Sequence, residues 1–156
     1  MMLDLVLKKI ALQLHGATAT DDDIRFLRSS FHESLVPDWF AALLRKNRLA
    51  GVNFSLSQED DKSKLGASVL WLTPMQIVSE ATECQPGISV VPLGFIPVGG
   101  CAEGSGDPYC LDMRGASSDP PVVRVPHDYA VQAPYPLDQV ELVTESLSEF
   151  FGKATF

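Results

Sequence analysis

Three segments near the N-terminus carry apolar residues at the spacing of an amphipathic helix. The stripes consist of Leu3, Val6, Leu7, Ile10 and Leu14, then Ile24, Leu27 and Phe31, and then Trp39, Phe40, Leu43 and Leu44. Polar and charged residues fill most of the other positions, so each segment predicts a helix with one buried face. Thr20 is a suitable N-cap for the second helix, and Pro37 suits the start of the third.

After residue 50 the apolar residues form short runs instead, which are typical of strands. Residues 51–56 and 67–72 are two such runs, and the charged loop 57–64 between them contains no core-forming residue. The segment from Thr73 to Gln76 then has the sequence of a capping box, which predicts a helix that continues to about residue 82.

The other predicted elements are arranged around a hairpin between Gly94 and Arg114. One apolar run covers residues 90–98 and a second covers residues 108–113. The segment between them carries a cluster of glycines, namely Gly99, Gly100, Gly104 and Gly106. Because glycine adopts positive φ at little cost, this arrangement predicts two strands joined by a long, bulged turn.

The C-terminal part predicts one more strand, residues 122–125, and a closing helix. Asp138 is the predicted N-cap of that helix, and Glu141 follows three residues later. Its predicted buried stripe consists of Val140, Val143, Leu147 and Phe150, next to Phe151. We therefore predict a single α+β domain over residues 1–156, whose antiparallel sheet is built around the central hairpin. The sheet packs against the N-terminal helices and the C-terminal helix.

Composition and charge restrict the classes of partner. The 156 residues are 46% apolar and 21% charged, which is ordinary for a soluble globular chain. Asp4, Lys8 and Lys9 interrupt the apolar N-terminus, so we interpret it as a helix rather than a signal peptide and expect a cytoplasmic protein without a membrane span. A net charge of −8 and a pI near 4.7 argue against nucleic acid as a partner and permit a basic partner protein. The same charge is also explained by solubility alone.

The three cysteines do not indicate a disulfide framework. Cys84, Cys101 and Cys110 are odd in number and form no CxxC pattern. Cys101 and Cys110 would face each other across a regular hairpin, but buried free thiols are the simpler interpretation.

Several polar groups admit a chemical role, although none forms a catalytic signature. An adjacent pair such as His127 and Asp128 serves acid–base chemistry or metal binding in some proteins, but neighbours in an extended segment point to opposite faces, which favours a structural turn. Asp107 and Asp112 have a separation that also places them on opposite faces of a strand. The acidic triplet 21–23 suits a helix N-terminus better than a metal site, and the glycine cluster lacks a phosphate-binding sequence. We predict no catalytic residue, no metal and no cofactor.

The order of these segments resembles a known family of proteins. The resembling elements are residues 22–27, 35–39 with 43–44, 71–77, 95–100 with 106–112, 121–123 with 127–128, and 140–151. Together they are similar to the SUKH superfamily, which includes the fungal Smi/Knr cell-wall-synthesis regulators and many bacterial proteins.

The resemblance implies a non-enzymatic domain that binds another protein. Many bacterial relatives look like immunity proteins, which neutralise toxins, often nucleases, by direct binding. A basic toxin would suit the acidic charge, while the oligomeric state stays open. Candidate contact residues are Asp107, Tyr109, Asp112 and Asp128, although a structural role in the hairpin comes first for Asp107 and Asp112. The alternatives are a small hydrolase that uses His127, Asp128 and a hairpin carboxylate, and a structural homo-oligomer joined through a sheet edge.

Overall fold

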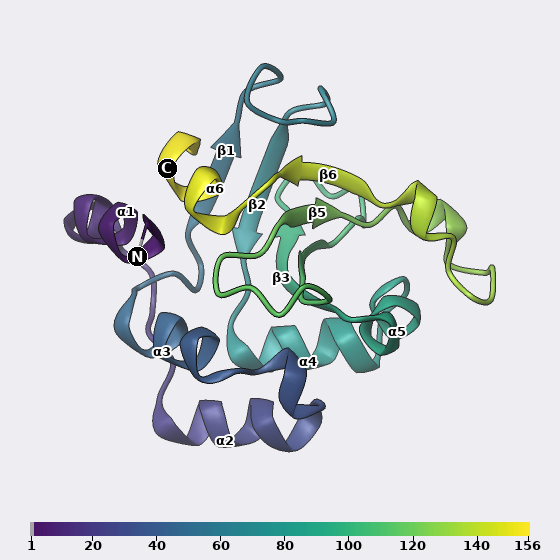
Figure 1. The fold of residues 1–156 in the computed structure, drawn as a ribbon, viewed down its shortest axis with the longest axis horizontal. Coiled ribbons are helices and arrows are strands. Elements are labelled where there is room, and N and C mark those ends of the chain that lie inside the picture. The colour runs from purple at the N-terminus through teal and green to yellow at the C-terminus, as the bar shows by residue number, and fades with distance from the viewer. Residues whose placement is uncertain (1) are drawn as a thin grey trace.

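Six strands form one antiparallel sheet in the computed structural model, which describes residues 2–156. They are β1 (Asn53–Leu56), β2 (Ala67–Trp71), β3 (Phe95–Cys101), β4 (Tyr109–Asp112), β5 (Val122–Arg124) and β6 (Glu141–Thr144). Each strand pairs with the next one along the chain, so the sheet is a meander (Figure 1). This order brings the β1–β2, β3–β4 and β5–β6 connections to one end of the sheet, which we call the hairpin end.

Along the chain, helices come before the strands, between them and after them. They are α1 (Met2–Ile10), α2 (Asp21–Ser30), α3 (Asp38–Lys46), α4 (Pro74–Thr82), α5 (Gly87–Val90) and α6 (Leu147–Lys153). The helix α1 packs against α6, α2 packs against α4, and α4 packs against β3. In Figure 1, α2, α3 and α4 lie together at the bottom, away from the β1–β2 connection at the top. The predicted α+β class is confirmed, with helices on the N-terminal and C-terminal sides of the sheet.

The helix starts follow the predicted local chemistry. Thr20 accepts a hydrogen bond from the backbone N–H of Asp23, and the Asp23 carboxylate accepts one from the backbone N–H of Thr20. Asp21 forms an ion pair with Arg45 of α3 at 2.9 Å. The acidic triplet is therefore used to cap α2 and to join it to α3. A second capping box, at Thr73, starts α4 as predicted.

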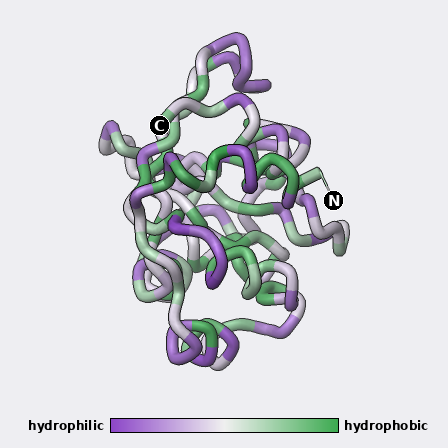
Figure 2. Tube along the Cα trace, turned by 90° about the vertical axis from the view of Figure 1, so that its left-hand side faces the viewer, coloured by the Kyte–Doolittle hydropathy of each residue, from purple (hydrophilic) through white to green (hydrophobic). Residues whose placement is uncertain are grey.

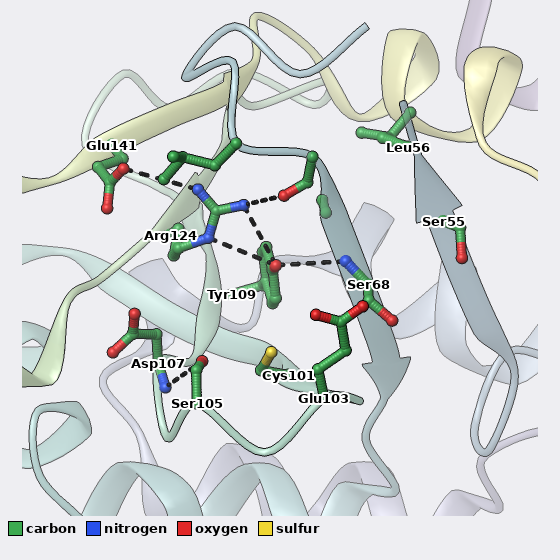
Figure 3. A pocket seen from close by; sticks show the side chains of 13 residues that line it. Ser55, Leu56, Ser68, Cys101, Glu103, Ser105, Asp107, Tyr109, Arg124 and Glu141 are labelled. Atoms are coloured by element: carbon green, nitrogen blue, oxygen red, sulfur yellow. Dashed lines mark hydrogen bonds and ion pairs between the residues drawn. The ribbon is translucent and has the colours of Figure 1, made fainter. Parts of the chain in front are cut away.

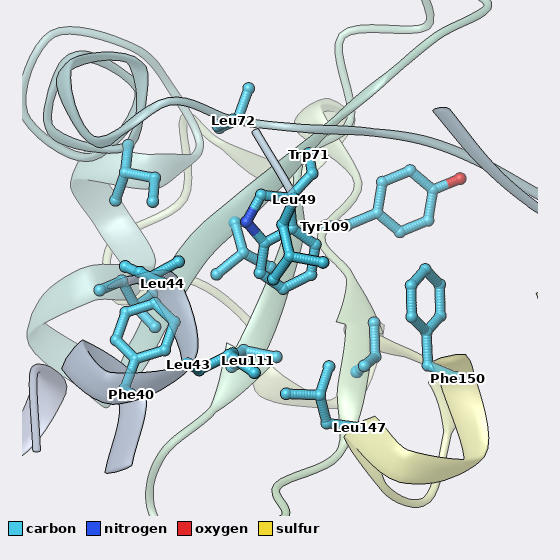
Figure 4. Packing of buried hydrophobic residues seen from close by; sticks show 14 of the residues in the cluster. Phe40, Leu43, Leu44, Leu49, Trp71, Leu72, Tyr109, Leu111, Leu147 and Phe150 are labelled. Carbon is cyan, nitrogen blue, oxygen red and sulfur yellow. The ribbon is translucent and has the colours of Figure 1, made fainter. Parts of the chain in front are cut away.

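Apolar side chains are buried on both faces of the sheet. The largest ones in the main cluster are Trp71, Tyr109, Phe40, Phe54, Phe150 and Phe151, and Figure 4 shows part of this packing. On β4, Tyr109 and Leu111 belong to the main cluster, whereas Cys110 belongs to a smaller cluster on the other face. The hydroxyl group of Tyr109 points away from the other labelled side chains (Figure 4), so this strand brings a polar group to the hairpin end.

The closing helix is shorter than predicted, and a strand precedes it. Asp138 lies in a 3₁₀ turn, η5 (Leu137–Gln139), and the chain then forms β6, which pairs with β5. Ser146 caps α6 instead, because its side chain accepts a hydrogen bond from the backbone N–H three residues later. The prediction was wrong because the spacing of Val140 and Val143 suits one helix face locally. In the fold these two valines pack in opposite clusters, and pairing with β5 supplies their segment's hydrogen bonds.

The central hairpin is present, but its first strand begins later than predicted. The segment before it forms α5 and a 3₁₀ turn, η3 (Val91–Leu93), and Gly94 follows with a φ of 105°. Gly99 lies inside β3 rather than in the turn, where a Cβ atom would be 2.3 Å from Cγ1 of Val69. The glycine therefore allows β2 and β3 to approach closely, and the turn itself comprises residues 102–108.

The cysteines are free thiols that do not face one another across the hairpin. Cys101 lies opposite Val69 of β2, and Cys110 lies opposite Pro97 of β3. Cys110 is completely buried, and burial raises the pKa of its thiol. Its surroundings are those of an inert core residue.

Candidate functional site

A pocket of about 420 Å³ lies at the hairpin end of the sheet, and all six strands contribute to it. The contributing positions are Ser55 and Leu56 of β1, Ala67 and Ser68 of β2, Cys101 of β3, Tyr109 of β4, Arg124 of β5 and Glu141 of β6. The β3–β4 turn adds Glu103, Ser105 and Asp107 (Figure 3). In a meander, every second connection lies at the same end of the sheet. Residues that are far apart in the sequence therefore line the same pocket.

A buried arginine connects β5 to the β1–β2 connection, residues 57–66. The guanidinium of Arg124 donates hydrogen bonds to the carboxylate of Asp61 at 3.0 Å, to the carbonyl oxygen of Gly66 at 2.7 Å and to the hydroxyl of Ser63 at 2.9 Å. The same connection reaches β6, where the backbone N–H of Lys62 donates to the carbonyl oxygen of Val143. The sheet is therefore curled, and the β1–β2 connection joins its two edges, β1 and β6.

Asp61 corrects the expectation that the charged loop 57–64 contributes nothing to the interior. Figure 2 shows this connection, at the top of the view, as mainly hydrophilic, yet the Asp61 side chain is completely buried. Its carboxylate accepts hydrogen bonds from the backbone N–H and the hydroxyl of Ser63, in addition to the one from Arg124. A buried carboxylate with three such donors is compensated for its loss of water.

Tyr109 completes the arginine's set of partners. Its hydroxyl oxygen lies 3.4 Å from Nε and 3.3 Å from Nη2 of Arg124, and it also accepts a hydrogen bond from the backbone N–H of Ser68. Glu141 lies further away, at 3.6 Å from Nη1. Burial alone would lower the pKa of Arg124, but Tyr109 and Asp61 raise it overall, so the guanidinium stays charged. Burial raises the pKa of the Tyr109 hydroxyl, which stays protonated.

Three carboxylates line the pocket, and they take part in fewer hydrogen bonds and ion pairs than the guanidinium of Arg124 does. Glu103 is exposed, and within residues 2–156 its carboxylate forms no hydrogen bond or ion pair. Among the described residues, the carboxylate of Glu141 forms one ion pair, at 3.6 Å from Nη1 of Arg124. Asp107 uses one of its two oxygens, Oδ1, for His127. Arg124 is the sole cationic residue among the described residues that line the pocket, so the free hydrogen-bonding capacity there is mainly that of acceptors.

His127 attaches the β3–β4 turn to the segment that follows β5. Its Nδ1 lies 2.5 Å from Oδ1 of Asp107, and its backbone N–H donates to the same oxygen at 2.9 Å. Asp107 therefore raises the pKa of His127, and Asp128 adds a smaller effect in the same direction. The structural turn predicted at these residues is present as a 3₁₀ turn, η4 (His127–Tyr129). The premise that His127 and Asp128 point to opposite faces is wrong, because Nε2 of His127 lies 3.4 Å from Oδ1 of Asp128.

The thiol of Cys101 is also part of the pocket. Burial alone would raise its pKa, but hydrogen bonds from the Ser105 hydroxyl and from the backbone N–H groups of Ser105 and Glu103 outweigh burial and lower it. The β3–β4 turn thus directs donors towards the sulfur atom and carboxylates towards the rest of the space.

The four candidate contact residues do not form one cluster. Asp107 and Tyr109 line the pocket. Asp112 lies at the other end of β4 and accepts three hydrogen bonds from Arg114, two from its guanidinium and one from its backbone N–H, which lower the pKa of the Asp112 carboxylate. Asp128 is exposed and lies outside the pocket, beside the ring of His127.

Sequence reasoning missed four residues of this site, namely Asp61, Glu103, Arg124 and Glu141. One of them had a detectable signal. Arg124 follows Val122 at the period of a strand, which places a charge on the face that buries Val122 and indicates a buried partner. The sequence around Asp61 gave no comparable signal, since acidic residues in a polar loop are usually solvated.

Comparisons with known proteins provide no relative: no family model, curated protein or solved structure matches this chain. In the part of the chain that the structure describes, no three His, Cys, Asp or Glu side chains converge as metal ligands would. The helices found in residues 2–156 are all too short or too polar to cross a membrane.

Proposed function

We propose that this chain is a non-enzymatic domain that binds a basic partner protein at the hairpin end of its sheet. The observation that carries the proposal is the imbalance inside the pocket. Arg124, a cation that lines the pocket, directs its N–H groups to the protein's own Asp61, Gly66, Ser63 and Tyr109, whereas the carboxylates at the margin have free acceptors. A cationic surface of a partner would satisfy those acceptors.

The net charge of the chain supports the same proposal. A charge of −8 attracts a basic protein over distances longer than a contact and repels a nucleic acid. A basic toxin of the nuclease type is the partner that the SUKH resemblance implies, and this identification stays a prediction.

The hydrolase alternative has one observation in its favour, the short His127–Asp107 contact. A carboxylate at Nδ1 is the arrangement that orients a histidine base. However, Nε2 of the same ring lies 3.4 Å from Oδ1 of Asp128. Both ring nitrogens therefore face carboxylates rather than a nucleophile, and this is why binding is proposed instead.

The homo-oligomer alternative is disfavoured at both edges of the sheet. Ser55 of β1 exchanges two backbone hydrogen bonds with Thr155, close to the C-terminus of the chain. On β6, Val143 accepts a hydrogen bond from Lys62 of the β1–β2 connection. These contacts occupy backbone groups that a second copy would otherwise use to extend the sheet.

The proposal is tested by isolating the partner and measuring its affinity as a function of salt. The immobilised chain is exposed to lysate, bound protein is eluted with a salt gradient, and the dissociation constant of the purified partner is measured at low and high ionic strength. We expect a basic protein whose affinity falls as salt is raised, because exposed charge contacts are screened. An affinity that does not change with salt, or an acidic partner, would contradict the proposal.

A further inference from the structure

The pocket at the hairpin end allows a more specific prediction of what the partner inserts there, and this prediction rests on the proposed function. We infer that it receives the cationic end of a single lysine or arginine side chain from the partner. The inference follows from the order of chemical groups along the walls of the pocket, from its buried floor to its exposed margin.

The floor of the pocket does not accept an anion. Arg124 would be the natural anion ligand, but its guanidinium already donates to Asp61, Gly66 and Ser63, and Asp61 neutralises its charge at 3.0 Å. An added phosphate or carboxylate would displace these buried hydrogen bonds and would lie near Glu141 as well. Anionic ligands are therefore excluded as the natural occupants.

The margin of the pocket accepts a cation. Glu103 extends from the β3–β4 turn towards Ser68 and Tyr109, and Glu141 lies on the other side of Arg124 (Figure 3). Asp107 adds an oxygen, Oδ2, that His127 does not use. Acceptors that line the pocket from a turn and from a separate strand match a charged group whose N–H donors point in several directions.

The remaining wall is apolar and suits the methylene stem of a long cationic side chain. Leu56 and Ala67 line the pocket at the ends of β1 and β2. Leu65 is exposed although it is a large apolar residue, and it also lines the pocket. Lysine and arginine bury an apolar stem while they keep a charged end in a polar environment. A volume of about 420 Å³ has room for such a side chain, and it lies within the usual range of ligand pockets, roughly 300–1,000 Å³.

The first experiment uses three amino-acid analogues with blocked termini: N-acetyl-lysine methylamide, its arginine counterpart and its norleucine counterpart. Each is titrated into the isotope-labelled chain and followed by two-dimensional NMR. We expect saturable shifts at Ser68, Cys101 and Glu103 with the lysine or the arginine analogue, and the tighter of the two identifies the side chain. Norleucine keeps the apolar stem but has no charge, so equal shifts with norleucine, or none with either cation, would overturn the inference.

A matched pair of variants locates the charge. Glu103→Gln keeps the shape of a side chain that forms no hydrogen bond or ion pair within residues 2–156. Glu33→Gln makes the same change in an exposed residue of the 3₁₀ turn η2 (Glu33–Leu35). We expect Glu103→Gln to weaken binding of the cationic analogue about fivefold, the equivalent of about 1 kcal/mol, and Glu33→Gln to leave it unchanged.

The same variants separate this inference from the proposed function. If the isolated partner binds in a salt-dependent manner and Glu103→Gln does not weaken it, the pocket inference fails while the binding function stands. If no salt-dependent partner is found, the proposed function fails, whatever the analogues do.

Discussion

Two ion pairs adjoin the same pocket, and they differ in how much water reaches them. Arg124 and Asp61 have side chains that are 6% and 0% exposed, and together they fix the β1–β2 connection. His127 and Asp107 have side chains that are 50% and 19% exposed, and together they fix the β3–β4 turn. Both pairs position an element of the pocket. The buried pair supports the fold itself, whereas the exposed pair holds a turn that a rise in pH or in salt concentration can loosen.

The largest effect is expected when the buried pair is broken. Asp61→Asn leaves the guanidinium of Arg124 buried without its carboxylate, so we expect a loss of about 3–5 kcal/mol in the free energy of unfolding, measured by chemical denaturation. Asp60→Asn is the matched control, since Asp60 is only partly buried and its contact with Lys153 is 3.9 Å long. Equal losses in the two variants would show that burial does not decide the cost.

The second prediction concerns the coupling between the two buried partners. Arg124→Met in the Asp61→Asn background removes the guanidinium that the first change left unpaired. We therefore expect the double variant to be more stable than the sum of the single changes, with a coupling of about 0.5–3 kcal/mol from the double-mutant cycle. Simple additivity would mean that Asp61 and Arg124 stabilise the fold independently.

The exposed pair is expected to show itself in a titration rather than in a large loss of stability. Asp107→Asn should lower the pKa of His127 towards its ordinary value of about 6.5, as followed by the NMR shifts of the ring. Because Asp107 raises the pKa of His127 in the folded state, its contribution to stability is complete below the unfolded value. That contribution disappears as the pH rises through the folded value. The stability difference between wild type and variant should therefore be present at acidic pH and vanish at alkaline pH, and a difference independent of pH would contradict this account.

The smallest effect is expected at the margin of the pocket. Glu103→Gln should leave the midpoint of thermal unfolding unchanged, because the Glu103 carboxylate forms no hydrogen bond or ion pair within residues 2–156. Differential scanning calorimetry of this variant beside Glu33→Gln checks the point. A clear destabilisation by Glu103→Gln alone would show that the residue supports the β3–β4 turn rather than a partner.

Local sequence signals predicted the parts of the fold that depend on neighbouring residues. The capping threonines Thr20 and Thr73 start their helices, and the strands before the hairpin lie where the short apolar runs predicted them. The prediction for the segment around Val140 was wrong because its apolar spacing suits a helix locally. Pairing with the preceding strand, β5, determines its structure instead. Pairing between strands is a tertiary property that overrides such short patterns.

The candidate site was harder to predict than the fold for the same reason. Asp107 and Tyr109, two of the predicted contact residues of the hairpin, line the pocket. Asp61 and Arg124 are 63 positions apart, and only the curling of the sheet brings them together. The hypothesis that the chain binds a partner protein rests first on a resemblance to a family, and it stays a prediction.

The most direct test of the central claim is to map the surface that the partner covers. Backbone amide shifts of the labelled chain are recorded with and without the partner purified by salt elution. This account predicts that the perturbed amides cluster in the β3–β4 turn, residues 102–108, and at Gly66, Ser68 and Glu141. A cluster on the exposed faces of α1 or α2, with these positions unchanged, would contradict it.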